Sequence, residues 1–280
     1  DNMLYSDYNL KIKMNLSEIK KQFFKKGYVV LDLESLNKKI DGVNKGINKI
    51  VESENIKKNP KAFHYNKSPR IVEAWKKVSE IKDIAKNKEI LKVLKYLKNR
   101  TPIPFSTINF LKGTEQPLHS DYFHFATKPH YYLVGAWIAL EDVSTKSGPL
   151  AIVEKSHKLP IITNEFLNQT IPKNETELKK NYTKYERYIK QLVKKKKLRT
   201  VELPVKKGQI IIWDANTLHG AFKIRDPKLT RKSMVIHYHF SNCEKYYNPL
   251  YSLTSKKIYS LRNIKKIKIV CCIFDFVHKK

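Results

Sequence analysis

The stretch KKGQIIIWDANTLHGAF, residues 206–222, contains a turn, a strand and a polar group in close succession. Gly208 marks the turn, and the run after it, 209–213, is short, apolar and β-branched, which is typical of a buried strand. His219 and Gly220 come after the end of that strand. We therefore expect a β-rich core here, with His219 as a candidate metal ligand if other ligands lie near it.

The same kind of short apolar run recurs on both sides of this stretch. Each run is rich in β-branched or aromatic residues and lies between turn signals, as in an antiparallel barrel or sandwich. The runs are FSTINFL (105–111), LVGAWIAL (133–140), PLAIV (149–153), RTVELPV (199–205) and KSMVIHYHF (232–240). A lysine-rich stretch at about 175–197 interrupts them and is predicted to be a helical insertion.

Helical patterns dominate the chain before residue 100. An N-cap region at Asn15 opens a helix that Gly27 ends, and YVVLDL (28–33) follows as a strand. Further helices are expected at about 36–53 and about 79–99, the second as one helix or a pair that ends near the breakers Pro102 and Pro104. Helices followed by a barrel-like β core predict an α+β fold in which the helices pack on the sheet.

The chain has the length and composition of one main domain. It has 280 residues, 41% of them hydrophobic, and it contains no internal repeat and no glycine- or proline-rich linker. We expect a single domain over 1–280. Its parts are a helical N-terminal part at about 15–100, the β core at about 105–245 and a C-terminal extension at about 250–280.

The formal net charge of +30 leaves two interpretations open. A field of this size attracts nucleic acid, anionic lipid or an anionic substrate. Yet 7 of the 56 basic residues are arginine, so the other 49 are lysine. Dedicated phosphate and base readers favour arginine, whose planar fork matches those groups. Lysine spread over every segment is more typical of biased codon usage, although the charge still favours an anionic substrate.

The cysteines and the hydropathy pattern predict a cytoplasmic protein. Cys243, Cys271 and Cys272 are an odd number without zinc-ligand spacing, so no disulfide framework is expected. The apolar run at 269–277 contains Asp275 and is too short to span a bilayer. The N-terminal region has no secretory pattern. We therefore expect no membrane span, while the oligomeric state stays open.

A second polar stretch, PLHSDYFHF (117–125), supplies two further candidate ligands. If it is extended, side chains two residues apart point to the same face, so His119 and Asp121 aim at one point. Two histidines and one carboxylate form the facial triad of non-haem Fe(II) oxygenases, which leaves coordination positions open. A His-x-Asp alone arises often by chance. His219, 100 residues after His119, would complete the triad.

Arg231 follows the distal histidine by twelve residues. If the Asp226-Pro227 turn closes a hairpin, Arg231 pairs near Lys223, about 13 Å along the sheet from His219. A metal-bound five-carbon dicarboxylate together with a guanidinium would fill that gap. Arginine suits the far carboxylate because it binds in a bidentate manner and stays charged.

In this order of motifs the chain resembles the phytanoyl-CoA dioxygenase family of Fe(II)/2-oxoglutarate oxygenases. WIALEDVSTKSGPLAIVEKSHKLP (137–160) is similar to the family's Trp-x-Ala-Leu-x-Asp, Gly-Pro-Leu and Ser-His-Lys blocks, and GQIIIWDANTLHGA is similar to its distal-histidine strand. The resemblance covers about residues 17–250. It implies a double-stranded β-helix (jelly-roll, cupin-like) core with N-terminal helices on the major sheet.

The resemblance also implies a role for individual residues. His119, Asp121 and His219 match the iron ligands, and Arg231 matches the partner of the 2-oxoglutarate C5 carboxylate. Trp137 falls where the family has a tryptophan beside the cosubstrate. The other two cosubstrate-binding candidates are Arg70 and Thr107.

The implied activity is that of a dioxygenase using Fe(II), 2-oxoglutarate and O2. It would hydroxylate a small-molecule metabolite or biosynthetic intermediate and release succinate and CO2. The carboxylate of Asp121 favours hydroxylation or another oxidation over halogenation, because related halogenases lack that ligand. The substrate itself cannot be read from the sequence.

The remaining histidines and aromatics have mostly structural interpretations. His124 and His130 would line a substrate mouth or be ordinary surface or core residues. His237 and His239 share the face of Arg231 on their strand, so an inward polar role is open to them. The residues more typical of structural positions are His157, Trp213 and Tyr238.

Two other functions are weighed against the oxygenase. A non-catalytic β-helix binding module is disfavoured by the intact ligand set and by the absence of a cupin His-x-His with a downstream glutamate. A basic protein that binds an anionic partner is disfavoured by the absence of a helix-turn-helix, zinc-finger or RNA-binding motif, so no specific nucleic-acid partner is expected.

Overall fold

The computed structural model describes residues 15–54, 64–65, 68–170 and 172–247. The predicted C-terminal extension at about 250–280 lies outside the described residues, as do Cys271 and Cys272. Within the described part, no helix has both the length and the apolar character that crossing a membrane requires.

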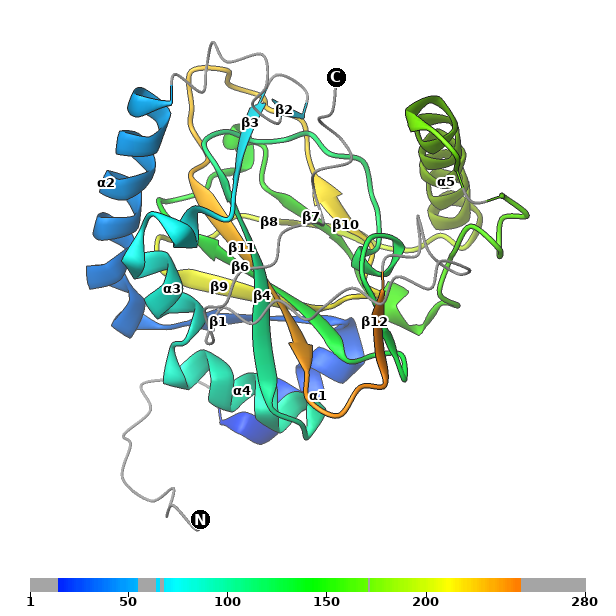
Figure 1. Cartoon of the computed structure of the whole chain (residues 1–280), viewed down its shortest axis with the longest axis horizontal. Coiled ribbons are helices and arrows are strands. Elements are labelled where there is room, and N and C mark those ends of the chain that lie inside the picture. Colours follow the sequence, from blue (N-terminus) through cyan, green and yellow to red (C-terminus); the bar gives the residue numbers. More distant parts are fainter. Residues whose placement is uncertain (1–14, 55–63, 66–67, 171, 248–280) are drawn as a thin grey trace.

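A seven-stranded antiparallel sheet forms the centre of the molecule, in the order β1-β9-β6-β11-β4-β3-β2 (Figure 1). In chain order its strands are β1 (Tyr28–Asp32), β2 (His64–Tyr65), β3 (Ser68–Val72), β4 (Pro102–Phe110), β6 (Leu133–Ala139), β9 (Gln209–Asp214) and β11 (Ser233–Phe240). In β6 and β11 every residue is buried, because helices cover one face of the sheet and a second sheet covers the other.

The second sheet has three strands in the order β10-β7-β8, and a separate pair joins β12 to β5. Their bounds are β5 (Ala126–Lys128), β7 (Leu150–Val153), β8 (Thr200–Leu203), β10 (His219–Ala221) and β12 (Lys245–Tyr247). Ile152 of β7 packs in one apolar cluster with Trp137, Ile211 and Val235 of the large sheet. Two antiparallel sheets that face each other across such a core confirm the expected jelly-roll arrangement.

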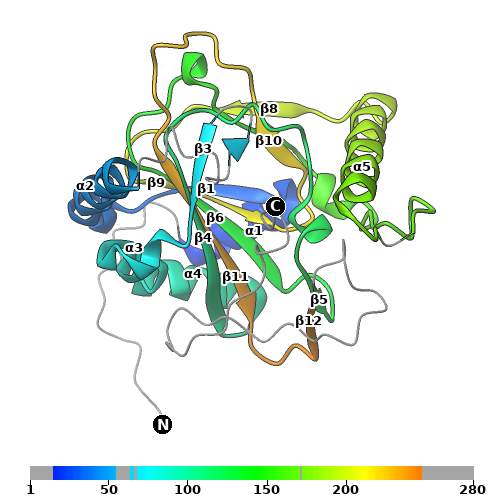
Figure 2. The ribbon, with the colours of Figure 1, turned by 45° about the horizontal axis from the view of Figure 1, so that its top comes forward.

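Four helices cover the outer face of the large sheet: α1 (Leu16–Lys26), α2 (Asn37–Ser53), α3 (Ser79–Ala85) and α4 (Lys88–Lys98) (Figures 1 and 2). The Asn15 side chain caps α1 by accepting a hydrogen bond from the Glu18 N–H, and Gly27 ends the helix with a φ of 93°. The expected stretch at 79–99 is a helix pair, since Asn87 caps α4. The predicted α+β class, with helices on the sheet, is confirmed.

The lysine-rich insertion is helix α5 (Glu175–Lys195), close to the expected bounds of 175–197. It stands apart from the other helices, at the opposite edge of the molecule (Figures 1 and 2). Its apolar side packs Tyr185 and Ile189 against Phe123, Val153 and Leu218. Short 3-10 helices also occur at Glu34–Leu36, Ala74–Lys76, Asp121–Phe123, Thr145–Ser147 and Ser156–Lys158.

One strand boundary and one connection differ from the expectation. Helix α4 ends at Lys98, near the two prolines as expected, but β4 begins at Pro102 rather than at Phe105, so Pro102 and Pro104 lie inside the strand. They are tolerated because β3 covers β4 only from Ile108 to Phe110. The expected hairpin between Lys223 and Arg231 does not form.

The sandwich architecture explains the missing hairpin. β10 pairs with β7 in the small sheet, whereas β11 lies between β4 and β6 in the large sheet. The Arg231 N–H donates to the Leu111 carbonyl, 3.0 Å away. β10 and β11 thus lie in opposite sheets, so the chain crosses the sandwich between His219 and Arg231.

Candidate metal centre

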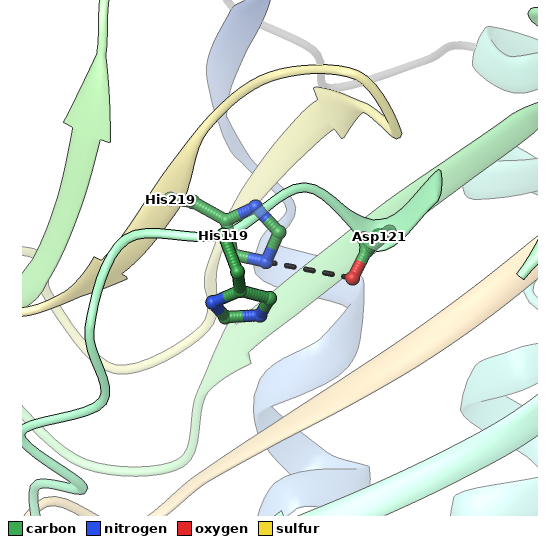
Figure 3. A group of neighbouring side chains, drawn as sticks. All are labelled: His119, Asp121 and His219. Carbon is green, nitrogen blue, oxygen red and sulfur yellow. Dashed lines mark ion pairs between the residues drawn. The ribbon is translucent and has the colours of Figure 1, made fainter. Parts of the chain in front are cut away.

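His119, Asp121 and His219 meet between the two sheets. One ligand atom from each lies within 4.8 Å of the others, and the three side chains are 4–6% exposed. Figure 3 shows the two imidazoles and the carboxylate close together, with His119 and Asp121 on one segment of the chain and His219 on another. Among the described residues, this is the group of histidine, cysteine and acidic side chains that could hold a metal ion.

Backbone hydrogen bonds bring the two histidines together. His119 and His219 form an isolated antiparallel bridge, in which each N–H donates to the other's carbonyl at 2.9 and 2.8 Å. The expected extended strand through Asp121, with alternating side chains, does not form. Asp121 begins a 3-10 helix, and the Ser120 side chain caps that helix by accepting from the Tyr122 N–H. The turn still directs the carboxylate to the two imidazoles.

Both imidazoles are held in the tautomer that a metal requires. His119 Nδ1 lies 2.9 Å from the Pro117 carbonyl, and His219 Nδ1 lies 2.9 Å from the Thr217 carbonyl. A carbonyl oxygen only accepts, so each Nδ1 carries the proton and each Nε2 has a free lone pair. Burial lowers the pKa of His119 and of His219, and mutual repulsion lowers that of His119 further. Both rings are therefore neutral at pH 7.

Asp121 is the anionic member of the group. Burial alone would raise its pKa, but His219 and His237 hold that pKa well below its usual range. Its Oδ2 accepts a 2.8 Å hydrogen bond from the Trp213 indole N–H. Its Oδ1 lies 3.5 Å from Nε2 of both His219 and His237. The carboxylate is thus ionised, with Oδ1 directed toward the histidines.

One row of the large sheet supports Asp121. His237 pairs with Gly135, and Gly135 pairs with Trp213, so the three residues lie side by side. A Cβ on Gly135 would lie 2.4–2.6 Å from the Trp213 ring, so glycine is required for the indole to cross this row. Sequence reasoning treated Trp213 as core and left the role of His237 open. The sequence around Trp213 and around His237 does not indicate the strand pairing that brings both side chains to Asp121.

Arg231 lies in the same core, buried and 2% exposed. Its Nη1 donates to the Gly148 carbonyl at 3.1 Å, and its guanidinium lies 5.7 Å from the Trp137 ring centre. Within the described part of the chain, Nε has no hydrogen-bond partner. Burial, together with the charge of Arg70, lowers the pKa of Arg231 to about 10. It therefore remains a cation at neutral pH, with donor capacity available to an anion.

Arg70 reaches this region from β3. Its guanidinium and that of Arg231 lie 5.6 and 5.9 Å from the Phe110 ring centre. Arg70 Nη2 donates to Gln116 Oε1 at 2.7 Å, and Gln116 Nε2 lies 3.2 Å from His119 Nε2. Gln116 was not among the predicted site residues, and no local signal distinguishes it.

Thr107 is not brought to the metal centre. It pairs with Ile236, which belongs to the apolar cluster beneath the helices, and directly paired residues share a face. Its buried side chain therefore points to the helix side of the sheet, which corrects the expectation that it contacts a cosubstrate. The sequence around Thr107 did not indicate which face of the strand its side chain would occupy.

The other histidines differ in their distance from the metal centre. His124 is close to the centre: its ring centre lies 5.9 Å from that of His119, and its Nε2 lies 3.3 Å from the Tyr182 hydroxyl. His239 stacks on Phe105 with ring centres 5.2 Å apart. His130 is exposed, and His157 contacts the Phe24 carbonyl outside the centre.

Comparison with known proteins gives one family. The family model described as "Phytanoyl-CoA dioxygenase (PhyH)" matches residues 23–233. Peroxisomal phytanoyl-CoA dioxygenase of Rattus norvegicus is 27% identical over 133 residues, which are 48% of this chain and 36% of that protein. The Homo sapiens enzyme is 23% identical over 184 residues, 60% of this chain and 51% of that protein. The chain thus spans about half the length or less of these curated relatives.

Solved structures share the fold at low identity. The carbocyclase SnoK of nogalamycin biosynthesis, described as non-haem and α-ketoglutarate-dependent, has a TM-score of 0.64 and 16% identity, covering 82% of this chain and 86% of its own. EctD from S. alaskensis with 2-oxoglutarate and 5-hydroxyectoine has a TM-score of 0.64 and 16% identity, covering 94% of this chain and 89% of its own. Both likenesses concern the fold.

Proposed function

The chain belongs to the phytanoyl-CoA dioxygenase family, and on that premise we propose that it is an Fe(II)- and 2-oxoglutarate-dependent dioxygenase that hydroxylates a small molecule, with release of succinate and CO2. The observation that carries this proposal is the buried group of His119, Asp121 and His219, whose ligand atoms lie within 4.8 Å of one another.

The donor set fits iron in chemistry as well as in position. Two neutral imidazole nitrogens and one carboxylate oxygen carry a single negative charge, and together they form the facial triad of non-haem Fe(II) enzymes. Both histidines donate their second ring N–H to a carbonyl two residues earlier, which fixes the ring orientation before a metal arrives. When bound, Fe(II) would supply the activation of O2 and the oxidative decarboxylation of 2-oxoglutarate.

Arg231 is the proposed partner of the far carboxylate of 2-oxoglutarate. It is a buried cation whose Nε has no hydrogen-bond partner among the described residues, and a planar guanidinium binds a carboxylate in a bidentate manner. Trp137 borders the guanidinium, so it would border the bound cosubstrate. Arg70 also lies near the Phe110 ring and adds a second positive charge to the same region.

A small molecule is the proposed substrate class. The metal centre is enclosed between two sheets, which favours a compact substrate over a folded macromolecule. SnoK belongs to nogalamycin biosynthesis and EctD is described with 5-hydroxyectoine bound, so these similar folds act together with small molecules. The net charge of +30 favours an anionic substrate.

An anaerobic titration tests this proposal. Fe(II) and 2-oxoglutarate are added to the protein, and the metal-to-ligand charge-transfer band of an iron-bound 2-oxo acid is followed in the visible range. The wild type is expected to give the band, and His119→Ala is expected to lose it. Arg231→Ala should need at least tenfold more 2-oxoglutarate, because a bidentate charged contact is worth roughly 1.5–3 kcal/mol.

His130→Ala is the matched control. His130 is exposed, so this variant should leave the band unchanged. A folded wild type that gives no band would contradict the oxygenase proposal. It would then favour the non-catalytic binding module, which has the same fold.

A further inference from the structure

Gln116 links the N-terminal part of the chain to the proposed iron ligands. Its backbone is fixed against β10, because its carbonyl accepts from the Ala221 N–H at 2.9 Å. A Cβ on Gly220 would come within 2.6 Å of that carbonyl oxygen, so glycine is what permits the close approach. From this fixed position the side chain extends between Arg70 and His119.

The hydrogen-bonding partners of the Gln116 side-chain amide determine which of its two ends is the oxygen and which is the nitrogen. Arg70 is only a donor, so the atom 2.7 Å from its Nη2 must be the amide oxygen. His119 donates its Nδ1 proton to the Pro117 carbonyl, so its Nε2 can only accept. The amide nitrogen therefore donates to Nε2 at 3.2 Å. The reverse orientation would place donor against donor and lone pair against lone pair.

This hydrogen bond uses the lone pair that a metal would need. One imidazole lone pair cannot accept a proton from Gln116 and bind a metal at about 2.1 Å at the same time. Metal binding must therefore release the amide from His119. Because Arg70 would still hold the amide oxygen, the freed N–H would remain beside His119.

We propose that Gln116, oriented by Arg70, is a positioning residue with two states. In the metal-free protein it caps His119 Nε2, and in the loaded protein it donates to the anionic oxygen of 2-oxoglutarate bound beside His119. This inference rests on the proposed function and assigns a role to two residues outside the ligand set. Donation to an anionic oxygen is stronger than donation to a neutral imidazole, so the second state is favoured once the cosubstrate binds.

The two states predict opposite effects of one substitution. Gln116→Leu removes the cap, so Co²⁺ added alone should bind about two- to tenfold more tightly than to wild type. The same variant lacks the donor, so 2-oxoglutarate should bind the Co²⁺-loaded protein about two- to tenfold more weakly. Isothermal titration calorimetry measures both constants without catalysis.

The matched control is Gln191→Leu, the same change on the exposed side of α5, which should alter neither constant. Gln116→Met repeats the test with an unbranched side chain if the leucine variant folds poorly. Weaker binding of both ligands in the Gln116 variants would indicate structural damage and would overturn the inference, as would unchanged binding of both. A wild type that binds neither Co²⁺ nor 2-oxoglutarate would overturn the proposed function as well.

Discussion

At the residue scale, the orientation of the Asp121 carboxylate depends on the indole of Trp213, 92 positions away in the sequence. The Trp213 N–H occupies Oδ2, which leaves Oδ1 as the atom that faces His219 and His237. A carboxylate fixed in this way is ready to act as a monodentate ligand. The arrangement requires a tryptophan on β9 and a glycine at position 135, since any larger residue would collide with the indole.

Trp213→Phe is predicted to keep the packing and lose this hydrogen bond. A hydrogen bond to a charged group contributes roughly 1.5–3 kcal/mol, and outer-shell partners typically change metal affinity by about 10–100-fold. We expect Co²⁺ affinity to fall by at least tenfold in calorimetric titrations. Trp75→Phe removes an indole N–H outside the metal centre and should leave the affinity unchanged. Equal affinities in the two variants would show that Asp121 needs no such support.

Tyr28 supplies a residue-scale prediction for pH. Burial, followed by the charge of Glu154 and a 3.3 Å hydrogen bond to it, raises the pKa of Tyr28 to about 12. The unfolded phenol ionises near its ordinary pKa of about 10, while the folded one keeps its proton. The folded state thus binds more protons between these values, and its stability falls as pH rises from about 10 to 12.

Tyr28→Phe should reduce this loss of stability. The contribution is about 1 kcal/mol, less than the full pKa difference implies, because the Glu154 side chain that faces the phenol is partly open to water. Urea unfolding of both proteins at pH 9 and near pH 12 measures it. The free energy of unfolding of the variant should fall less over this range than that of wild type, whereas parallel curves would exclude the proposed linkage.

At the element scale, helix α5 supports the segment that carries His119 and Asp121. The Tyr185 hydroxyl accepts from the buried Ser120 N–H at 2.8 Å, and its ring stacks on Phe123 with centres 3.7 Å apart. The Tyr182 hydroxyl contacts His124 from the same helix. A lysine-rich insertion on the outside of the molecule therefore determines the position of residues inside it.

Tyr185→Phe is predicted to weaken metal binding although it touches no ligand. The change leaves the buried Ser120 N–H without its acceptor, which costs about 1–3 kcal/mol. Part of that cost should appear as a severalfold loss of Co²⁺ affinity, because Ser120 lies between two proposed ligands. Tyr188→Phe on the same helix is the matched control, since its ring packs on Phe166 at the surface. A loss of stability with unchanged Co²⁺ affinity would limit α5 to a role in folding.

The elements themselves were largely predictable, and their partners were not. Caps at Asn15 and Gly27 and the apolar run at 209–213 are local signals, so they predicted helix and strand correctly. The hairpin expected near Pro227 was wrong because local turn residues do not specify which sheet the next strand joins. Gln116 and Trp213 were missed, and the role of His237 stayed open, for the same reason: their roles arise from pairings between distant segments.

At the scale of the whole molecule, the charge of +30 acts on folding as well as on ligands. Several surface ion pairs are present, such as Lys39–Asp83 at 3.3 Å and Lys206–Asp142 at 3.0 Å, and exposed pairs of this kind contribute little. Basic residues outnumber acidic ones by 56 to 26, so repulsion between like charges outweighs these attractions. Compacting the chain brings the excess positive charges closer together and destabilises the folded state.

Salt is therefore predicted to stabilise this protein. Salt screens repulsion between charges that lie more than a Debye length apart, and this length falls from about 30 Å at 0.01 M to about 10 Å at 0.1 M. We expect the melting temperature to rise by a few degrees as NaCl increases from about 0.01 to 0.3 M, and then to level off as screening saturates. A continued linear rise would indicate a general salting-out effect. A fall would mean that attractive pairs dominate, and it would remove the argument that uncompensated lysine attracts anionic substrates.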